Sequence, residues 1–356
     1  MMKTGIPKEC MVGEGRVALV PADCAQLIAA GCEVIVESNA GLDSGYDDAA
    51  FAAVGARIVA DAPALYASAE LIVKVKQPLA PDLALLQSHH LLFSFLHLAA
   101  DPGLIATLCD LGLTAIPFEA VADVHGGFPL LAPMSAIAGR LSIIRGASLL
   151  FSNRGGRGVL LGGVDGADAG RVVVLGAGIA GSHAAATAVQ LEAEVHVFDL
   201  NQAKLDTLHQ RWPQIRTHSA DAAVIAEHCE RADLVVGAVM LAGRRAPVVL
   251  RQDSIARMHP GAVIVDIAID QGGCIEGIRS TTAQELVYRH LEVLHSAVPN
   301  MPGAVPRTAA QSLSAAIRPY VQQLASTRLD DLPQLSSAIA IQAGRVVDPV
   351  LQRELG

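Results

Sequence analysis

The sequence predicts an α/β protein made of two domains with parallel sheets, one of them inserted into the other. The chain has 356 residues, which at roughly 100–200 residues per domain predicts two domains. Hydrophobic residues make up 52% of it and aromatic residues only 3%, so Ala, Val, Leu and Ile must fill the core, as in helices packed on a buried parallel sheet. Short β-branched runs alternate with helical stretches, a pattern typical of parallel βαβ units.

In the first half of the chain this alternation gives four strands and three helices. The expected strands are residues 3–6, 32–37, 71–75 and 91–95. The expected helices are residues 22–30, 47–54 and 102–111. Because helices lie between the strands, crossover connections and parallel pairing are expected.

The second half repeats the pattern more clearly. Its expected strands are residues 171–175, 194–198, 234–239 and 262–267. Its expected helices are the Ala-rich residues 179–191 and residues 202–212. From Thr308 onward the chain reads as mostly helical, and it is long enough to return and pack on the first domain. The prediction is therefore a discontinuous outer domain, 1–129 with 307–356, around an inner domain, 130–306.

A glycine motif marks the inner domain as Rossmann-like. Gly176, Gly178 and Gly181 form a GxGxxG directly after a strand and before a helix. The first glycine permits the tight turn, the second lets the backbone approach a pyrophosphate, and the third lets the helix lie close to the strand. Asp199, 18 residues after Gly181, can accept hydrogen bonds from the ribose hydroxyls and would repel a 2′-phosphate. The motif therefore predicts an NAD site.

Other features narrow the class of partner. The net charge of −9, without a basic run, argues against nucleic acid. No apolar leader follows the N-terminus, and residues 172–191 are better explained by the glycine turn than by a membrane span. No His/Cys group has ligand spacing, so no metal site is expected. A second glycine cluster, from Gly155 to Gly163, could line the cofactor, but a flexible interdomain loop is favoured.

Polar residues after buried strands are candidates for binding a substrate and for proton transfer. Arg16 follows the first strand, and arginine binds carboxylates with two parallel hydrogen bonds. Lys74 and Lys76 would share one face of a strand, with Lys76 near its carboxyl end. His97 ends the strand at 91–95 and could shuttle a proton, although a satisfied core histidine is the simpler interpretation.

Two aspartates near the end of an inner-domain strand are rival candidates for an acid–base group. Asp270 lies in the loop after the strand at 262–267, where ligands of α/β proteins bind. Asp266 lies inside that strand and is expected to bond to loop backbone instead.

Nine ordered sequence blocks resemble the alanine dehydrogenase family from end to end. They are GIPKE with GRVALVPA, LIVKVKQP, LLFSFLHLA, LLAPMSAIAGR, GGRGVLLGGV, VVVLGAGIAG, ADLVVGAV, PGAVIVDIAIDQGGCIE and VPNMPGAVPRT. The resemblance implies a cytoplasmic homohexamer of amino-acid catabolism that reversibly deaminates L-alanine to pyruvate and ammonia, with NAD accepting the hydride.

The resemblance also implies roles for individual residues. Arg16 and Lys76 would hold the substrate, His97 would transfer the proton, and Asp270 would be its partner across the cleft. Glu119 would support His97 or Lys76. Besides the motif glycines and Asp199, the implied NAD contacts are Ser135, Ile179, Ala180, Lys204, Val239, Met240, Ile267, Arg279, Val298, Asn300 and Met301.

The chain departs from the family pattern at a few positions. Gln77 stands where glutamate is common and Phe118 where tyrosine is usual, Pro299 interrupts a usual run, and Arg307 replaces a lysine. Three other functions remain as alternatives to alanine deamination. The first is the soluble NAD-binding part of a proton-translocating nicotinamide nucleotide transhydrogenase. The others are an opine-type or lysine-forming reductive aminase and a non-catalytic NAD-responsive protein.

Overall fold

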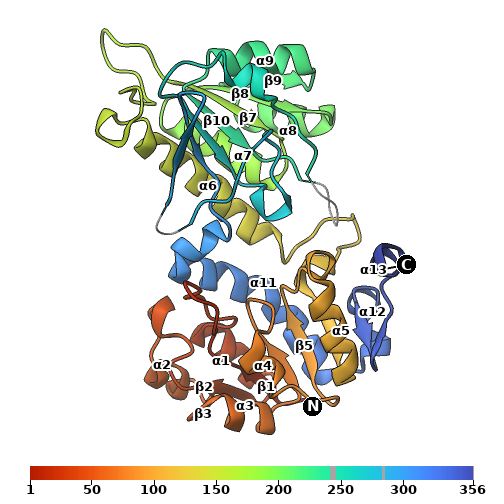
Figure 1. Cartoon of the computed structure of the whole chain (residues 1–356). Helices are drawn as coiled ribbons and strands as arrows, with labels where there is room; N and C mark the ends of the chain where they lie inside the picture. The colour runs from red at the N-terminus through yellow and green to blue at the C-terminus, as the bar shows by residue number, and fades with distance from the viewer. Residues whose placement is uncertain (241–245, 283–284, 356) are drawn as a thin grey trace. The chain divides into compact units, whose positions relative to one another are not determined.

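The chain divides into two compact units, each built around its own sheet. The computed structural model describes residues 1–240, 246–282 and 285–355 (Figure 1). Unit 1 comprises Met1–Met134 and Gly303–Gly356, and unit 2 comprises Ser135–Pro302. A discontinuous outer unit around an inserted inner one is the organisation that the sequence predicts, and the observed limits lie a few residues from the expected ones.

The sheet of unit 1 is mostly parallel. Its strand order is β15 (Arg345–Val346), β14 (Ile341–Gln342), β6 (Thr114–Pro117), β5 (Leu91–Ser94), β4 (Leu71–Val73), β1 (Thr4–Ile6), β2 (Val34–Glu37) and β3 (Arg57–Val59). The pairs from β6 to β3 are parallel, whereas β14 runs antiparallel to both β6 and β15. The expected strands are confirmed, but β4 ends at Val73, two residues before its predicted end.

Each helix of unit 1 has a proline in its first turn or begins after a capping aspartate. They are α1 (Pro21–Ala29), α2 (Asp48–Ala53), α3 (Ala62–Ser68), α4 (Ala80–Leu83), α5 (Pro102–Leu111), α11 (Pro306–Ser326), α12 (Pro333–Ser336) and α13 (Pro349–Leu355). In α5, the Asp101 side chain accepts a hydrogen bond from the Leu104 amide, and Gly112 ends the helix with a φ of 72°. The predicted bounds of α5 are confirmed.

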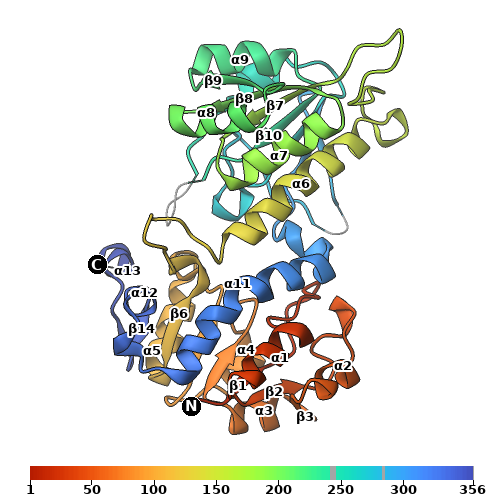
Figure 2. The same cartoon turned by 180° about the vertical axis from the view of Figure 1, so that it is seen from behind.

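The C-terminal tail returns to unit 1, as predicted. Helix α11 contacts α1, as Figure 2 shows from behind. The Ser314 hydroxyl accepts a hydrogen bond from the Val20 amide at 2.9 Å and donates one to Asp23 at 2.6 Å. Arg318 adds an ion pair to Asp23 at 3.2 Å. The tail is less helical than expected, because β14 and β15 extend the sheet beyond β6.

The sheet of unit 2 has seven strands. Its order is β12 (Tyr288–His290), β13 (Val293–Ser296), β11 (Val263–Asp266), β10 (Leu234–Gly237), β7 (Arg171–Leu175), β8 (Glu194–Asp199) and β9 (Arg216–Ser219). All pairs are parallel except β12 with β13. The accompanying helices are α6 (Ala132–Leu149), α7 (Ile179–Gln190), α8 (Gln202–Arg211), α9 (Ala222–Glu230) and α10 (Gln252–Ile255).

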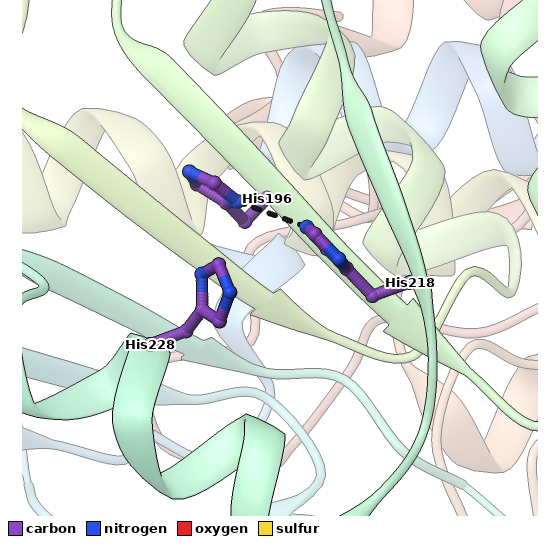
Figure 3. A group of neighbouring side chains, drawn as sticks. All are labelled: His196, His218 and His228. Carbon is purple, nitrogen blue, oxygen red and sulfur yellow. Dashed lines mark hydrogen bonds between the residues drawn. The ribbon is translucent and has the colours of Figure 1, made fainter.

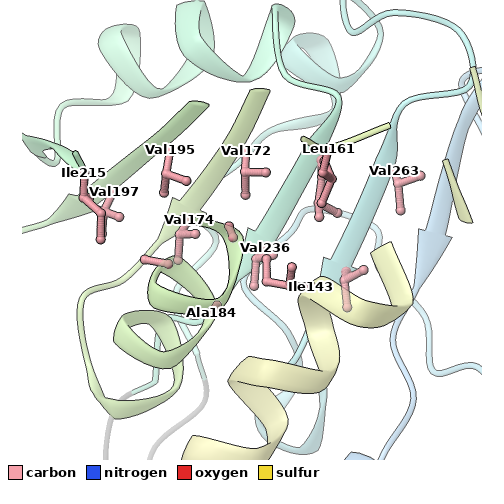
Figure 4. Packing of buried hydrophobic residues seen from close by; sticks show 14 of the residues in the cluster. Ile143, Leu161, Val172, Val174, Ala184, Val195, Val197, Ile215, Val236 and Val263 are labelled. Carbon is pink, nitrogen blue, oxygen red and sulfur yellow. The ribbon is translucent and has the colours of Figure 1, made fainter. Parts of the chain in front are cut away.

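Strand β7 is buried on both faces, which explains its continuous apolar sequence. Val172 and Val174 pack with Ala184 of α7 and Ile143 of α6, as Figure 4 shows. On the other face, Val173 belongs to a second cluster. Because a parallel sheet covered by helices has no solvated face, β-branched residues occupy successive positions of the strand.

Two sequence interpretations in unit 2 can be compared with the structure. Residues 172–191 form β7, the turn and α7, and among the described residues no helix is long and apolar enough to cross a membrane. The favoured interpretation of Gly155–Gly163 as an interdomain loop is wrong, because this segment lies inside unit 2. Arg157 fixes it there through a 2.6 Å ion pair with Asp233 and an amide hydrogen bond to the Gly261 carbonyl.

Candidate cofactor and substrate sites

The three motif glycines of unit 2 lie in three different environments. Gly176 has a φ of 102°, and a Cβ there would lie 2.7 Å from the Ala238 carbonyl oxygen. A Cβ on Gly181 would lie 1.8 Å from the Gly176 carbonyl oxygen, so α7 could not start this close to β7 with any other residue. A Cβ on Gly178 would meet no atom within 4 Å. The turn therefore leaves open space over Gly178, at the amino end of α7, where a pyrophosphate would bind.

Asp199 joins the glycine turn to the neighbouring strand. It ends β8, and its Oδ2 accepts a hydrogen bond from the Ala177 amide at 2.6 Å. Its Oδ1 accepts one from the Asn201 amide at 2.8 Å. The carboxylate is thus held beside the turn by both oxygens, in the position from which it could also accept from ribose hydroxyls.

Most of the other candidate cofactor residues gather at one edge of this sheet. The carboxyl ends of parallel strands meet at the same edge, and the helix connections change direction between β7 and β10. The residues that follow these strand ends are Val239 and Met240 after β10, Ile267 after β11, and Val298, Asn300 and Met301 after β13. Ile179 and Ala180 begin α7, and Lys204 lies in the first turn of α8.

Ser135 reaches this region through α6. A Cβ on Gly139 would lie 2.0 Å from the Ala180 carbonyl oxygen, so α6 passes directly against the start of α7 at Gly139. Ser135 is four residues earlier on the same helix and therefore shares the face of Gly139. The sequence gives no sign of this close helix crossing other than the glycine itself.

Arg279 is engaged within unit 2. Its guanidinium lies 3.9 Å from the centre of the Tyr288 ring and pairs with Glu285 at 2.8 Å. This candidate therefore forms an exposed ion pair and does not follow the end of a parallel strand.

A hollow of about 420 Å³ lies beside the glycine turn. It is lined mainly by α7 and α8 and includes only Ala177 of the turn. The candidate Lys204 lines it, but none of the candidate residues after β10, β11 or β13 does.

In unit 1, the substrate candidates follow four neighbouring strands. Arg16 comes after β1, Lys76 after β4, and His97 after β5. Glu119, in the 3₁₀ turn Phe118–Ala120, comes after β6. Because the sheet order is β6-β5-β4-β1 and these strands are parallel, the four segments leave the same edge side by side.

Arg16 is a buried residue held by Glu14. The side chain is 2% exposed, and its Nε and Nη2 donate to the two oxygens of Glu14 at 2.6 and 2.5 Å. Nη1 contacts the sulfur of Met134 at 3.0 Å. The pair with Glu14 fixes the plane of the guanidinium, which is what a bidentate carboxylate site requires.

Lys74 is part of a buried ion network. It lies after the end of β4, not on the strand face shared with Lys76 that the sequence predicts, and its Nζ is 3.1 Å from Asp82 and 3.6 Å from Glu9. Tyr66 and Cys10 also donate to Asp82, at 2.8 and 3.0 Å.

At Lys74 and Asp82 the charges of this network outweigh the effect of burial, whereas burial raises the pKa of Glu9. Burial by itself would lower the pKa of Lys74, but the two carboxylates raise it. Burial would likewise raise the pKa of Asp82, but Lys74 and the hydrogen bonds from Cys10, Leu79 and Tyr66 lower it. Lys74 is therefore charged and paired, with a structural part in the site.

Glu9 carries the segment that contains Lys76. Its two carboxylate oxygens accept hydrogen bonds from the Val75 amide at 2.6 Å and the Lys76 amide at 3.4 Å. Lys76 itself is half-buried. The backbone after β4 is thus fixed by Glu9 and by the ion pair of Lys74.

His97 has an unusual backbone conformation stabilised by Glu119. Its φ of 48° is in the left-handed region, and the Glu119 carboxylate accepts hydrogen bonds from the amides of His97 and Leu96, at 2.5 and 3.2 Å. Its Nδ1 lies 3.9 Å from the same carboxylate, and the side chain is 44% exposed. This rules out the simpler interpretation of a satisfied core histidine. Such strain occurs mostly where function requires it.

Asp266 and Asp270 have different environments. Asp266 is fully buried and accepts hydrogen bonds from the amides of Ala268, Cys274 and Ile275, as the sequence predicts for a residue inside the strand. Burial raises its pKa to about 6, although these hydrogen bonds oppose the shift. Asp270 is exposed in the 3₁₀ turn Ile269–Gln271 and accepts from the Asn300 amide at 3.4 Å.

Three of the departures from the family pattern have a structural setting. Phe118 is fully buried and packs edge-on against Phe93 and Phe95, at ring-centre distances of 4.5 and 5.1 Å. Arg307 lies 5.0 Å from the Tyr46 ring centre and donates to the Gly45 carbonyl. The buried Oε1 of Gln77 has no hydrogen-bond partner among the described residues.

Sequence reasoning missed the carboxylates that hold these side chains. Glu9, Glu14 and Asp82 are all buried, which is rare for acidic residues without a partner. Glu9 ends the GIPKE block, and Glu14 lies two residues before Arg16. An acidic residue close in sequence to an expected buried basic one could have indicated the pair of Glu14 with Arg16. No spacing rule links Glu9 or Asp82 to Lys74.

Comparisons with known proteins agree over the whole chain. Residues 5–138 match the model "Alanine dehydrogenase/PNT, N-terminal domain", and residues 142–349 match "Alanine dehydrogenase/PNT, C-terminal domain". An alanine dehydrogenase of Halomonas elongata is 44% identical over 325 residues, 91% of this chain and 88% of that protein.

Solved structures give the same grouping. An L-alanine dehydrogenase structure superposes with a TM-score of 0.96 at 42% identity, covering 99% of both chains. A transhydrogenase from Sinorhizobium meliloti superposes at 0.84 with 26% identity, covering 97% of this chain and 99% of that one. On the two family models and the full-length relatives, the chain belongs to the alanine dehydrogenase/PNT family.

Proposed function

We propose that the protein catalyses the reversible oxidative deamination of L-alanine to pyruvate and ammonia, with NAD as hydride acceptor. The observation that carries this proposal is the arrangement of Arg16, Lys76 and His97 on neighbouring strand ends of unit 1. A small 2-amino or 2-oxo acid needs a cation for its carboxylate, a donor for its oxo group and a proton acceptor. The full-length similarity to alanine dehydrogenases supports the choice of substrate.

Unit 1 supplies groups for binding and proton transfer. The guanidinium of Arg16, oriented by Glu14, would take the substrate carboxylate, and the ammonium of Lys76 would donate to the oxo group. Neutral His97 would accept a proton from the ammonium group of the substrate, whose Cα hydrogen leaves as a hydride. Glu119 would hold the backbone of His97 in place. Water then adds to the imine, and loss of ammonia gives pyruvate. Asp270 of unit 2 is proposed as the second acid–base group.

Unit 2 supplies a site that fits a nicotinamide dinucleotide. The open space over Gly178 lies at the start of a 12-residue helix, whose free amides favour a pyrophosphate. The cofactor, when bound, accepts the hydride. The carboxylate of Asp199 would bind the ribose hydroxyls and repel a 2′-phosphate, so we propose NAD rather than NADP.

The test is a steady-state assay on a panel of amino acids with NAD and with NADP. We expect alanine-dependent formation of NADH, and a loss of turnover of roughly 10²–10⁴-fold in His97→Ala with NAD binding retained. His89→Ala is a matched control, because exposed His89 precedes β5 whereas His97 follows it. Near-normal turnover of His97→Ala, or equal losses in both variants, would refute the role of His97.

The same assay separates the rival functions. Because of the similarity to the Sinorhizobium meliloti transhydrogenase, one alternative is a transhydrogenase component that would bind NAD and not use alanine. Its lower similarity, and the presence of Arg16, Lys76 and His97, favour the dehydrogenase. An opine-type enzyme would consume NADH and pyruvate with lysine or ornithine in place of ammonia.

We also propose, from the family resemblance, a homohexamer in the cytoplasm with no nucleic-acid partner. Light scattering on the purified protein tests the assembly, and a mass of one or two chains would contradict it.

A further inference from the structure

Three histidines meet on one face of the unit 2 sheet. His196 lies on β8, His218 on the neighbouring β9, and His228 in the last turn of α9 (Figure 3). In the register of the two strands, His218 is paired with Phe198, two residues from His196 and on the same side of the sheet. The sequence predicts no metal site because no local ligand spacing is present, but the fold brings together residues from two strands and a helix.

The ring nitrogens are close enough to bind one ion. One nitrogen of each ring lies within 4.8 Å of those of the other two. The Nδ1 of His196 and the Nε2 of His218 are 3.0 Å apart. Two nitrogens bonded to one tetrahedral zinc at about 2.05 Å would be about 3.4 Å apart, so these two rings need to move by only a few tenths of an ångström.

The third ring supplies a nitrogen that protein contacts leave unused. The Nδ1 of His228 is shielded from solvent and has no hydrogen-bond partner among the described residues. Its ring centre is 4.5 Å from that of His196 and 4.7 Å from that of His218. A buried nitrogen without a hydrogen-bond partner costs stability.

A carboxylate behind the cluster orients the first ring. The Nε2 of His196 lies 3.2 Å from Glu194, which is itself paired with Arg171 at 3.1 Å and Arg216 at 2.5 Å. Metal-binding histidines commonly donate their other N–H to such a carboxylate. With the proton on Nε2, the Nδ1 lone pair of His196 points toward His218.

Ring stacking by itself explains only part of this cluster. His218 stacks on Phe198 at 4.7 Å and is nearly parallel to His196. These contacts place two of the rings, but they give no partner to the Nδ1 of His228.

We propose that His196, His218 and His228 bind one divalent transition-metal ion of the zinc, cobalt and nickel class, with water completing the coordination. Imidazole is a preferred ligand for these ions. In the metal-free protein, the protonated Nε2 of His218 donates a hydrogen bond to the Nδ1 of His196. On binding, that proton moves to the Nδ1 of His218, and both facing nitrogens become ligands. The ion would tie α9 to β8 and β9 and so stabilise unit 2.

The test is metal binding by the full-length protein after treatment with a chelator. Zn²⁺ is titrated in competition with a chromogenic indicator, and Co²⁺ is added to record its visible absorption. We expect one tight site per chain, and at least a tenfold loss of affinity in His228→Gln and in His218→Gln. His259→Gln is the matched control, because His259 is an exposed histidine of unit 2 outside the cluster.

Thermal unfolding gives a readout independent of the indicator. Zn²⁺ should raise the melting temperature of the wild type and of His259→Gln but not of His228→Gln. If one cluster variant does not fold, the other keeps the test decisive, because both must lose the same site. Wild-type affinity in either folded cluster variant, or equal binding losses in all three variants, would overturn the proposal.

Discussion

The open space over Gly178 permits a substitution that separates cofactor binding from folding. In Gly178→Ala, the new methyl group would meet no protein atom within 4 Å. The backbone there, with φ −68° and ψ −173°, is one that alanine adopts readily. A compatible Gly→Ala change stabilises a protein by about 0.4–1 kcal/mol, so the melting temperature without cofactor should stay equal or rise slightly.

The same methyl group should weaken the binding of the dinucleotide. If the pyrophosphate lies against Gly178, one extra methyl group in that close contact costs about 1–3 kcal/mol. That cost corresponds to a roughly 5- to 150-fold increase in the Kd for NADH. The assay is a fluorescence titration with NADH, paired with thermal unfolding of the same sample.

A matched variant shows the opposite behaviour. In Gly181→Ala, the new Cβ would lie 1.8 Å from the Gly176 carbonyl oxygen, so the turn must shift and both stability and binding should fall. An unchanged NADH Kd in Gly178→Ala would show that the phosphates do not approach this residue. A fall of several degrees in its melting temperature would show that the space over Gly178 is needed by the protein itself.

Three further predictions concern charged groups. Lys74→Met leaves two buried carboxylates without their cation, so it should lower the free energy of unfolding measured in urea by about 3–5 kcal/mol. The control is Lys3→Met, which removes a half-exposed ion pair and should change that free energy by less than about 1 kcal/mol. Asp266 has a pKa of about 6 in the folded protein, which is above its pKa in the unfolded chain. As the pH rises from about 4 to about 6, the free energy of unfolding should therefore fall by at most about 3 kcal/mol because of this group. Asp266→Asn should remove this pH dependence. Asp199→Asn should raise the Kd for NAD and reduce the preference for NAD over NADP, because it removes the charge that we propose to lie beside the ribose.

Each of these has an outcome that contradicts it. Equal small effects in Lys74→Met and Lys3→Met would mean that the buried network is not charged. An identical pH dependence in wild type and Asp266→Asn would assign the slope to other groups. Unchanged selectivity in Asp199→Asn would remove Asp199 from the ribose site.

Local sequence patterns determined much of the fold. The glycine turn, α5 and β7 lie at their predicted residues, because turn chemistry, helix caps and runs of β-branched residues act over a few positions. The alternation of strands and helices also predicted the two units. The other strands were not predicted, because each is only two to four residues long and its pairing depends on neighbouring strands that the fold supplies; these are β3, β6, β9, β12, β13, β14 and β15.

The sequence placed Arg16, Lys76 and His97 after strands, but the strand order decided that these strands are neighbours. The partners of the buried charges depend on contacts between distant residues: Glu9 meets the segment after β4 from 66 positions away, and Cys10 meets Asp82 from 72. The His196, His218 and His228 cluster arises in the same way. Hydrogen bonds and ion pairs act over a few ångströms in space, whereas sequence patterns report only neighbours along the chain, so the tertiary structure alone decided which charges are paired.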